Sequence, residues 1–300
     1  MMLLWLALQD TVAEAKPYKI DDGPHKVTFT KTFKLHDDAR GKDVPVNAWV
    51  PDGDGPFPVI IFSHGAGGAG SNEFPVTRHW ATHGYVVVQP THADSRSLNG
   101  GELKRTDDGP AQRALDVKFV IDSLEKVEDF KGKLDLKRIG VGGHSFGAHT
   151  SMLIGGATVD VKGEAKSYAD ERPKALLLLS GQGAGMLGLT EKSWDACKRP
   201  MMAMTGSKDL GVAGQTPAQK LEAFTRSPEG DKYGVDIEGA SHMSFTGRLA
   251  DREPEIFSYV KTASIAFWDA YINEEPAAKD FLKSDALKTL SKDAVKLQRR

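Results

Sequence analysis

The stretch that decides the fold is Arg138-Ile139-Gly140-Val141-Gly142-Gly143-His144-Ser145-Phe146-Gly147-Ala148-His149. An apolar run leads into a Gly-x-Ser-x-Gly pattern, and helix-forming residues follow it. The pattern predicts a strand, a very sharp turn and a helix, with Ser145 in the turn and glycines where strand and helix crowd together. A turn of this kind exposes the serine hydroxyl at the end of a sheet. The alternative is a glycine-rich turn without chemistry, since the chain has 31 glycines.

Short apolar runs on either side of this stretch extend the same arrangement. Residues 58–63 and 85–89 are continuously apolar, and a helix is expected between them over about 72–83. Runs that are apolar on both faces are typical of buried parallel strands. A helix over about 112–126 carries one apolar stripe, which indicates core packing.

The alternation of strands and helices predicts an α/β fold in one domain. We expect a mostly parallel sheet of about eight strands with helices on both faces, and an antiparallel hairpin from residues 26–35 and 44–50 at its start. Later elements are expected as strands at 175–179, 201–204 and 233–237, the last of the sheet, and helices at 217–226 and 264–272. The domain is expected to span residues 16–300, with a charged, solvated helical tail from about 276.

The charge composition argues against one class of partner, and the first residues predict where the protein is located. Lysine and arginine number 39 against 41 acidic residues, and no basic stripe interleaved with aromatics occurs, so nucleic acid is not an expected partner. Residues 1–15 resemble a signal peptide, with an apolar start and the small-x-small sequence 13–15. This favours a secreted or periplasmic protein, and a cytoplasmic one if the segment is not a signal. No stretch is apolar for long enough to span a membrane.

Ser145 needs a base and an acid, because a serine hydroxyl is a poor nucleophile near neutral pH. Functional groups in an open sheet gather after the carboxyl ends of the strands. Asp209 and His242 each follow a predicted strand, which predicts a catalytic triad of Ser145, Asp209 and His242. Asp195 is the alternative acid, although it precedes a strand. His144 is interpreted as a packing residue.

The glycine-rich segment 64–68 directly follows the first core strand. Glycines let backbone amides approach a ligand, so the amides of Ala66 and Phe146 are the predicted oxyanion-hole donors. A flexible loop without chemistry is the alternative. Gly65, Gln182 and Met243 adjoin these segments and are predicted to contact substrate.

His92 and Asp94 are spaced so that both could reach one metal ion. A metal site needs three or four ligands, and only these two are visible, so we interpret them as bracing residues. No metal is therefore expected at these two residues.

Together the loop 64–68, the Ser145 turn, the segment 206–209 and Ser241-His242 resemble the α/β-hydrolase superfamily over about residues 26–272. Within it, the segments 92–96 and 113–122 are similar to dienelactone-hydrolase-like and platelet-activating-factor-acetylhydrolase-like serine esterases, and the polyester-hydrolase and cutinase group has a similar layout. The resemblance implies cleavage of carboxylic esters without a cofactor. Dienelactone hydrolase uses a cysteine nucleophile, so Ser145 argues against that particular activity.

The expected reaction is hydrolysis of a carboxylic ester through an acyl-enzyme. About twenty residues separate the strands 175–179 and 201–204, too few for a large cap, which favours short acyl esters or an accessible polymer. A serine peptidase or amidase would use the same residues, and a non-catalytic binding protein could keep the same fold.

Overall fold

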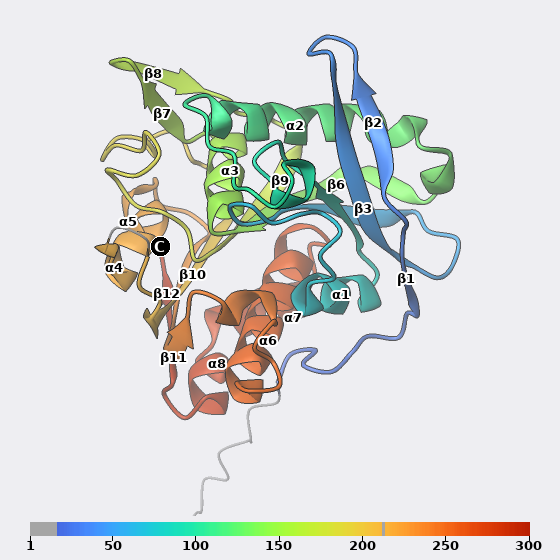
Figure 1. The fold of residues 1–300 in the computed structure, drawn as a ribbon. Coiled ribbons are helices and arrows are strands. Elements are labelled where there is room, and N and C mark those ends of the chain that lie inside the picture. Colours follow the sequence, from blue (N-terminus) through green and yellow to red (C-terminus); the bar gives the residue numbers. More distant parts are fainter. Residues whose placement is uncertain (1–16, 212–213) are drawn as a thin grey trace, which may run out of the picture.

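The computed structural model describes residues 17–211 and 214–300, and the expected signal segment 1–15 lies outside them. Within the described residues, ten strands form one twisted sheet, in the order β1-β3-β5-β4-β6-β9-β10-β11-β12 with β2 beside β3 (Figure 1). The strands from β5 to β11 in this order run parallel, while the strands at both edges are antiparallel. The predicted α/β-hydrolase type of sheet is confirmed.

The strands of this sheet are β1 (Val27–Phe29), β2 (Phe33–Asp37), β3 (Lys42–Pro51), β4 (Phe57–Ser63), β5 (Val86–Pro90), β6 (Leu134–His144), β9 (Pro173–Leu179), β10 (Met201–Lys208), β11 (Lys232–Ser241) and β12 (Val295–Arg299). A separate hairpin consists of β7 (Thr158–Val161) and β8 (Glu164–Ser167).

Helices cover both faces of the sheet (Figure 1). One face carries α2 (Gly109–Ser123), α3 (Phe146–Ile154), α4 (Pro217–Lys220) and α5 (Glu222–Arg226), and the other carries α1 (Pro75–Thr82), α6 (Pro254–Tyr271), α7 (Pro276–Lys283) and α8 (Ala286–Leu290). The buried side chains accordingly divide into two apolar clusters, one on each face.

Strand β4 shows why its sequence is apolar throughout. Val59 and Ile61 belong to the cluster under α2 and α3, whereas Ile60 and Phe62 belong to the cluster under α1 and α6. Successive side chains of a strand point to opposite faces, so a strand covered on both sides needs an apolar residue at every position. The continuous run that predicted a buried parallel strand has this physical cause.

The C-terminal tail differs from the expected solvated helix. Phe281, Leu282 and Leu287 of α7 and α8 are buried against α6 and its neighbours, and β12 then pairs antiparallel with β11. The prediction that β11 is the last strand is therefore wrong. The pattern Val295-Lys296-Leu297 alternates with the period of a strand, and pairing it covers the edge of β11 that would otherwise expose unpaired backbone groups.

Smaller differences concern the first strand, an additional hairpin and one helix. The expected first strand 26–35 is divided into β1 and β2, and both halves pair with β3. The hairpin β7–β8 was not predicted, because β8 is exposed along its whole length and carries no apolar pattern. The expected helix 217–226 is interrupted at Leu221.

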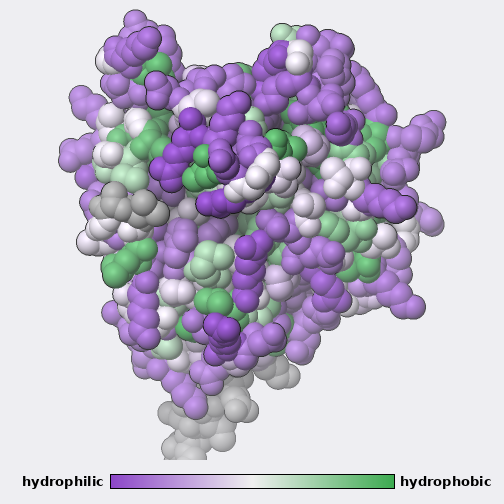
Figure 2. Space-filling model, in the orientation of Figure 1, coloured by the Kyte–Doolittle hydropathy of each residue, from purple (hydrophilic) through white to green (hydrophobic). Residues whose placement is uncertain are grey.

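Figure 2 shows this side of the molecule covered mostly by hydrophilic side chains, with small hydrophobic patches between them. The large apolar side chains that are most exposed among the described residues are Leu98, Val161, Leu187, Leu210 and Met243. None of the described helices is both long enough and apolar enough to cross a bilayer.

Candidate active site

Ser145 occupies the sharp turn between β6 and α3. Its backbone has φ 54° and ψ −119°, which an L-residue adopts only under strain, and it forms the N-cap of α3. Its amide donates to the carbonyl oxygen of Leu179, at a distance of 2.9 Å, which fixes the turn against β9. The predicted strand, sharp turn and helix are confirmed.

Two glycines make this turn possible. A Cβ atom on Gly147 would lie 1.8 Å from the carbonyl oxygen of Ser63, and one on Gly143 would lie 2.3 Å from the carbonyl carbon of Gly147. Neither contact is sterically possible without moving backbone. The glycines of the motif are therefore required by close packing, as the sequence predicted.

The predicted base and the predicted acid contact each other. His242 follows β11, and its Nδ1 atom is 3.1 Å from Oδ1 of Asp209, which follows β10. Asp209 is fully buried and also accepts a hydrogen bond from Thr205 Oγ1 at 3.1 Å. Asp195, the alternative acid, is exposed in the loop before β10. The structure thus places Asp209 against the imidazole.

The pKa of Asp209 reflects these contacts. Burial alone would raise it, but the hydrogen bond with His242, the charge of Lys220 and the hydrogen bond from Ser180 outweigh burial and hold the pKa below its ordinary value. The carboxyl group therefore stays ionised at neutral pH. An ionised acid can stabilise the imidazolium that forms when His242 takes up a proton.

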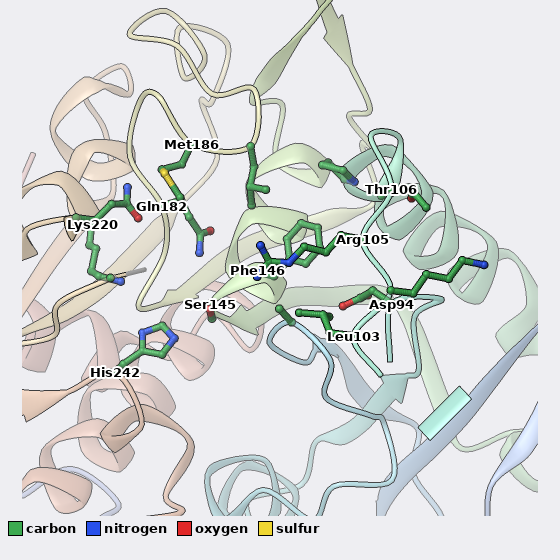
Figure 3. Close-up of a pocket in the computed structure, with 17 residues that line it drawn as sticks. Asp94, Leu103, Arg105, Thr106, Ser145, Phe146, Gln182, Met186, Lys220 and His242 are labelled. Atoms are coloured by element: carbon green, nitrogen blue, oxygen red, sulfur yellow. The ribbon is translucent and has the colours of Figure 1, made fainter. Parts of the chain in front are cut away.

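Ser145 and His242 line the same cavity and lie near one another at one end of it (Figure 3). Among the described residues the Ser145 hydroxyl has no hydrogen-bond partner, so its contact with the imidazole is not closed in this conformation. Catalytic hydrogen bonds are often open in the absence of substrate and close in the complex. Both side chains face the space that a substrate would fill.

The predicted oxyanion-hole donors belong to residues that share a cavity with Ser145. Ala66 and Phe146 both line the cavity, and no described residue accepts a hydrogen bond from the amide of either. Phe146 is the first residue of α3, where helical amides have no partner within the helix. The two amides are therefore available to a developing oxyanion.

A buried ion pair fixes the loop that carries Ala66. Arg113 of α2 donates to both carboxylate oxygens of Asp94, at 2.8 and 2.9 Å, and to the carbonyl oxygen of His64 at 2.7 Å. Asp94 in turn accepts from the amide of Gly67 at 2.9 Å. The Arg113 guanidinium also lies 4.1 Å from the ring centre of Phe146, so one side chain supports both halves of the predicted oxyanion hole.

His92 and Asp94 have separate protein partners. His92 is hydrogen-bonded to Asp116 through Nδ1 and to Ser63 through Nε2, each at 3.1 Å, whereas Asp94 binds Arg113. Burial would raise the pKa of Asp94, but Arg113 and the amide of Gly67 hold it at about 2. The arrangement agrees with the interpretation of both residues as bracing groups.

The cavity has a volume of about 180 Å³ and combines apolar walls with a few polar groups. Its lining includes Leu103, Phe146, Met186 and Leu187, together with Gln182, Gln215, Lys104, Arg105 and Lys220. Of the three residues predicted to contact substrate, only Gln182 lines it. Gly65 packs against the Ser145 turn, and Met243 is exposed at the surface because it begins a short 3-10 turn after His242.

Three residues around His242 were not identified from the sequence as part of the site. His144 Nε2 lies 2.7 Å from the carbonyl oxygen of His242, so this residue holds the loop of the base as well as packing. Ser180 Oγ lies 2.6 Å from His242 Nδ1, and Lys220 Nζ lies 3.0 Å from Ser180 Oγ. Ser180 directly follows β9, which is the one signal that could have indicated it; Lys220, in α4, carries none.

Two family models match the chain. The model described as Chlorophyllase matches residues 19–166, and that described as Platelet-activating factor acetylhydrolase, isoform II, matches residues 103–247. Among curated proteins, none matches it. Both families are α/β-hydrolase-type serine esterases, and their matches together cover the described Ser145 turn and the residues that follow β10 and β11. On the sheet order, the Ser145 turn and these two matches, the fold is of the α/β-hydrolase type, and the chain is similar to serine esterases of that superfamily.

Proposed function

We propose that the protein hydrolyses carboxylic esters through an acyl-enzyme on Ser145. The observation that carries this proposal is the position of a strained serine beside the hydrogen-bonded pair His242 and Asp209, at the wall of one cavity. Strain of this kind persists where the surrounding structure enforces it and is concentrated at functional sites. The similarity to two families of ester hydrolases supports the same class of reaction.

In the first half of the reaction, Ser145 Oγ attacks the carbonyl carbon of the ester. His242 Nε2 takes the hydroxyl proton, and the amides of Ala66 and Phe146 stabilise the negative charge on the carbonyl oxygen. When the intermediate collapses, the bond between the carbonyl carbon and the alcohol oxygen breaks, and His242 gives its proton to the departing alcohol. Asp209 remains ionised throughout and stabilises the imidazolium.

In the second half, water replaces the alcohol. His242 removes a proton from the water molecule, whose oxygen attacks the acyl carbon, and the same proton then returns to Ser145 as the acid leaves. No step needs a metal or an organic cofactor, since the chain's own residues supply the nucleophile, the base and the oxyanion donors.

The cavity favours a short acyl group. A volume of about 180 Å³ is below the usual range of small-molecule pockets, and no helix or strand between residues 180 and 200 covers its mouth. Gln182 Oε1 and Gln215 Nε2 are buried without a hydrogen-bond partner among the described residues. These two amides offer one acceptor and one donor to polar atoms of the substrate.

Labelling and turnover test this proposal together. We expect a fluorophosphonate to label the wild-type protein and p-nitrophenyl acetate to be hydrolysed, and both reactions to be lost in Ser145→Ala. A panel of p-nitrophenyl esters is expected to give the highest kcat/KM at short acyl length. Faster turnover of a matched anilide would instead indicate an amidase, and an unlabelled but folded wild-type protein would favour a binding function.

A further inference from the structure

The contact between the acid and the base differs from a simple Asp–His pair. His242 Nδ1 is 3.1 Å from Asp209 Oδ1 but only 2.6 Å from Ser180 Oγ. Ser180 Oγ is also 2.9 Å from Asp209 Oδ1. A hydroxyl has one proton to donate and can accept from two donors, so it can accept from the imidazole while it donates to the carboxylate. The shorter of the two contacts that His242 Nδ1 makes is therefore with Ser180, which in turn contacts Asp209.

A buried cation completes this cluster. Lys220 Nζ donates to Ser180 Oγ at 3.0 Å and lies 3.3 Å from Asp209 Oδ1, although the lysine is only 1% exposed. An ammonium group donates but cannot accept, so it directs the Ser180 hydroxyl proton toward the carboxylate. Burying a lysine is costly, and it is tolerated here because a carboxylate and a hydroxyl meet it.

Backbone conformation adds an independent observation. Ser180 has φ 53°, a left-handed value that is uncommon for residues other than glycine, and it is fully buried. Glycine would adopt this conformation without strain. The serine keeps an unfavourable conformation in a place where its hydroxyl contacts His242, Asp209 and Lys220 together.

On these contacts we propose that Ser180 and Lys220 are positioning residues of the catalytic site: Ser180 links His242 to Asp209, and Lys220 orients Ser180 and competes with the protonated imidazole for the negative charge of Asp209. The inference rests on the proposed function, since the pair acts through His242. Without the charge of Lys220, the negative charge of Asp209 would act on the imidazolium alone.

The other charged groups around His242 differ from Lys220 in burial or in charge. The titratable and charged groups that face it or share its cavity are Asp209, Lys220, His144, Lys104, Arg105 and the Asp94–Arg113 pair. Burial lowers the pKa of His144 to about 3, so its ring stays neutral, while Lys104 and Arg105 are exposed and screened by water. Lys220 is the buried cation of this set that touches the acid.

The pH dependence of kcat/KM on p-nitrophenyl acetate tests the role of Lys220. In Lys220→Met we expect the acid limb to move to higher pH by about one unit or more, and in Lys220→Arg, which keeps the charge, to stay near the wild-type position. Lys232→Met is the matched control, because Lys232 is equally buried but binds the carbonyl oxygens of Lys198 and Gly230. An acid limb in Lys220→Met that coincides with the wild type and with Lys232→Met overturns the role of Lys220.

Ser180→Gly separates positioning from packing. The substitution relieves the backbone strain but removes the hydroxyl that Lys220 contacts, so we expect a small net change in melting temperature, whereas kcat falls about tenfold or more with little change in KM. A merely structural serine would give the opposite result, with altered stability and unchanged kcat. Wild-type kcat in a folded Ser180→Gly protein overturns the role of Ser180.

Proton NMR reads the same contact without a substrate. The Nδ1 proton of His242, observed at low field in histidine-labelled protein, is expected to move to higher field in Ser180→Gly, because its 2.6 Å contact is lost. An unchanged resonance contradicts the proposal even if Lys220→Met does not fold. If the wild type cleaves no ester, the proposed function fails, while the resonance still reports whether Ser180 holds the imidazole.

Discussion

The ring centre of His144 lies 4.7 Å from that of His242, and the Nε2 atom of His144 donates to the His242 carbonyl oxygen at 2.7 Å. The residue before Ser145 therefore holds the loop that carries His242. Burial lowers the pKa of His144 to about 3, so the ring is neutral at pH 7 and can direct its single N–H at the carbonyl.

We expect His144→Phe, which keeps a ring but removes this donor, to reduce kcat about tenfold and to lower the free energy of unfolding by about 1–3 kcal/mol, the usual cost of leaving a buried polar group unpaired. Steady-state ester hydrolysis and urea unfolding measure the two effects. Unchanged kcat in the folded variant would show that the His242 loop keeps its position without this bond.

The buried pair of Arg113 and Asp94 allows a test by double substitution. Arg113→Met leaves the Asp94 carboxylate buried without its partner, so we expect a loss of about 3–5 kcal/mol in the free energy of unfolding and a large fall in kcat as the loop of Ala66 loosens. Adding Asp94→Asn removes the stranded charge and is expected to recover part of the stability but little of kcat. Equal recovery of both would contradict a role in holding the oxyanion loop.

The glycines of the Ser145 turn lead to a steric expectation. Gly147→Ala would place a methyl group 1.8 Å from the carbonyl oxygen of Ser63, so we expect loss of both labelling and native stability. Gly109→Ala is the control for folding, because a Cβ atom there would lie 3.5 Å from Thr106 Oγ1, an ordinary contact. Circular dichroism and fluorophosphonate labelling compare the two variants, and a folded, labelled Gly147→Ala protein would disprove the packing argument.

A buried histidine far from the site gives a pH dependence of stability. His79 is 1% exposed and both ring nitrogens lack a hydrogen-bond partner among the described residues; burial, then the charge of His83, lowers its pKa to about 3. As the pH falls below 6.5, His79 binds a proton in the unfolded chain, whereas in the folded protein it stays unprotonated until about pH 3. The free energy of unfolding therefore decreases across this window by up to about 1.4 kcal/mol per pH unit.

We expect His79→Phe to remove this loss, so its stability advantage over the wild type grows as the pH is lowered from 6.5 toward 3. The control is His36→Gln at an exposed position, where Asp43 raises the pKa of the histidine. His36→Gln is expected to lose stability relative to the wild type as the pH falls, because the contact of protonated His36 with Asp43 stabilises the wild-type fold in acid. Urea unfolding at pH 7 and pH 5 measures both, and a constant difference between His79→Phe and wild type would contradict the account.

The sequence was sufficient for the elements that a strong local pattern determines. The apolar run of β4, the stripe of α2 and the Gly-x-Ser-x-Gly turn predicted the parallel sheet and the position of Ser145 correctly. Asp209 and His242 could be selected because both follow a strand at the edge where functional groups gather.

Elements without a local signal were missed. The tail from residue 276 looked amphipathic, and only its contacts with α6 and the free edge of β11 make it part of the core and the sheet. Ser180 and Lys220 were not predicted from the sequence. Their contacts join the end of β9, α4 and the loop of His242, which are far apart in the chain. Met243 adjoins His242 in the sequence, but it precedes a 3-10 turn and is exposed.

The central claim is that Ser145 carries the acyl group, and peptide mapping of the trapped intermediate tests it most directly. After brief exposure to p-nitrophenyl acetate and acid quenching, we expect one acetyl group per wild-type chain, on the peptide that contains Ser145, and none on Ser145→Ala. An acetyl group on another residue, or a folded wild-type protein that hydrolyses the ester and reacts with no fluorophosphonate, would contradict the proposed mechanism.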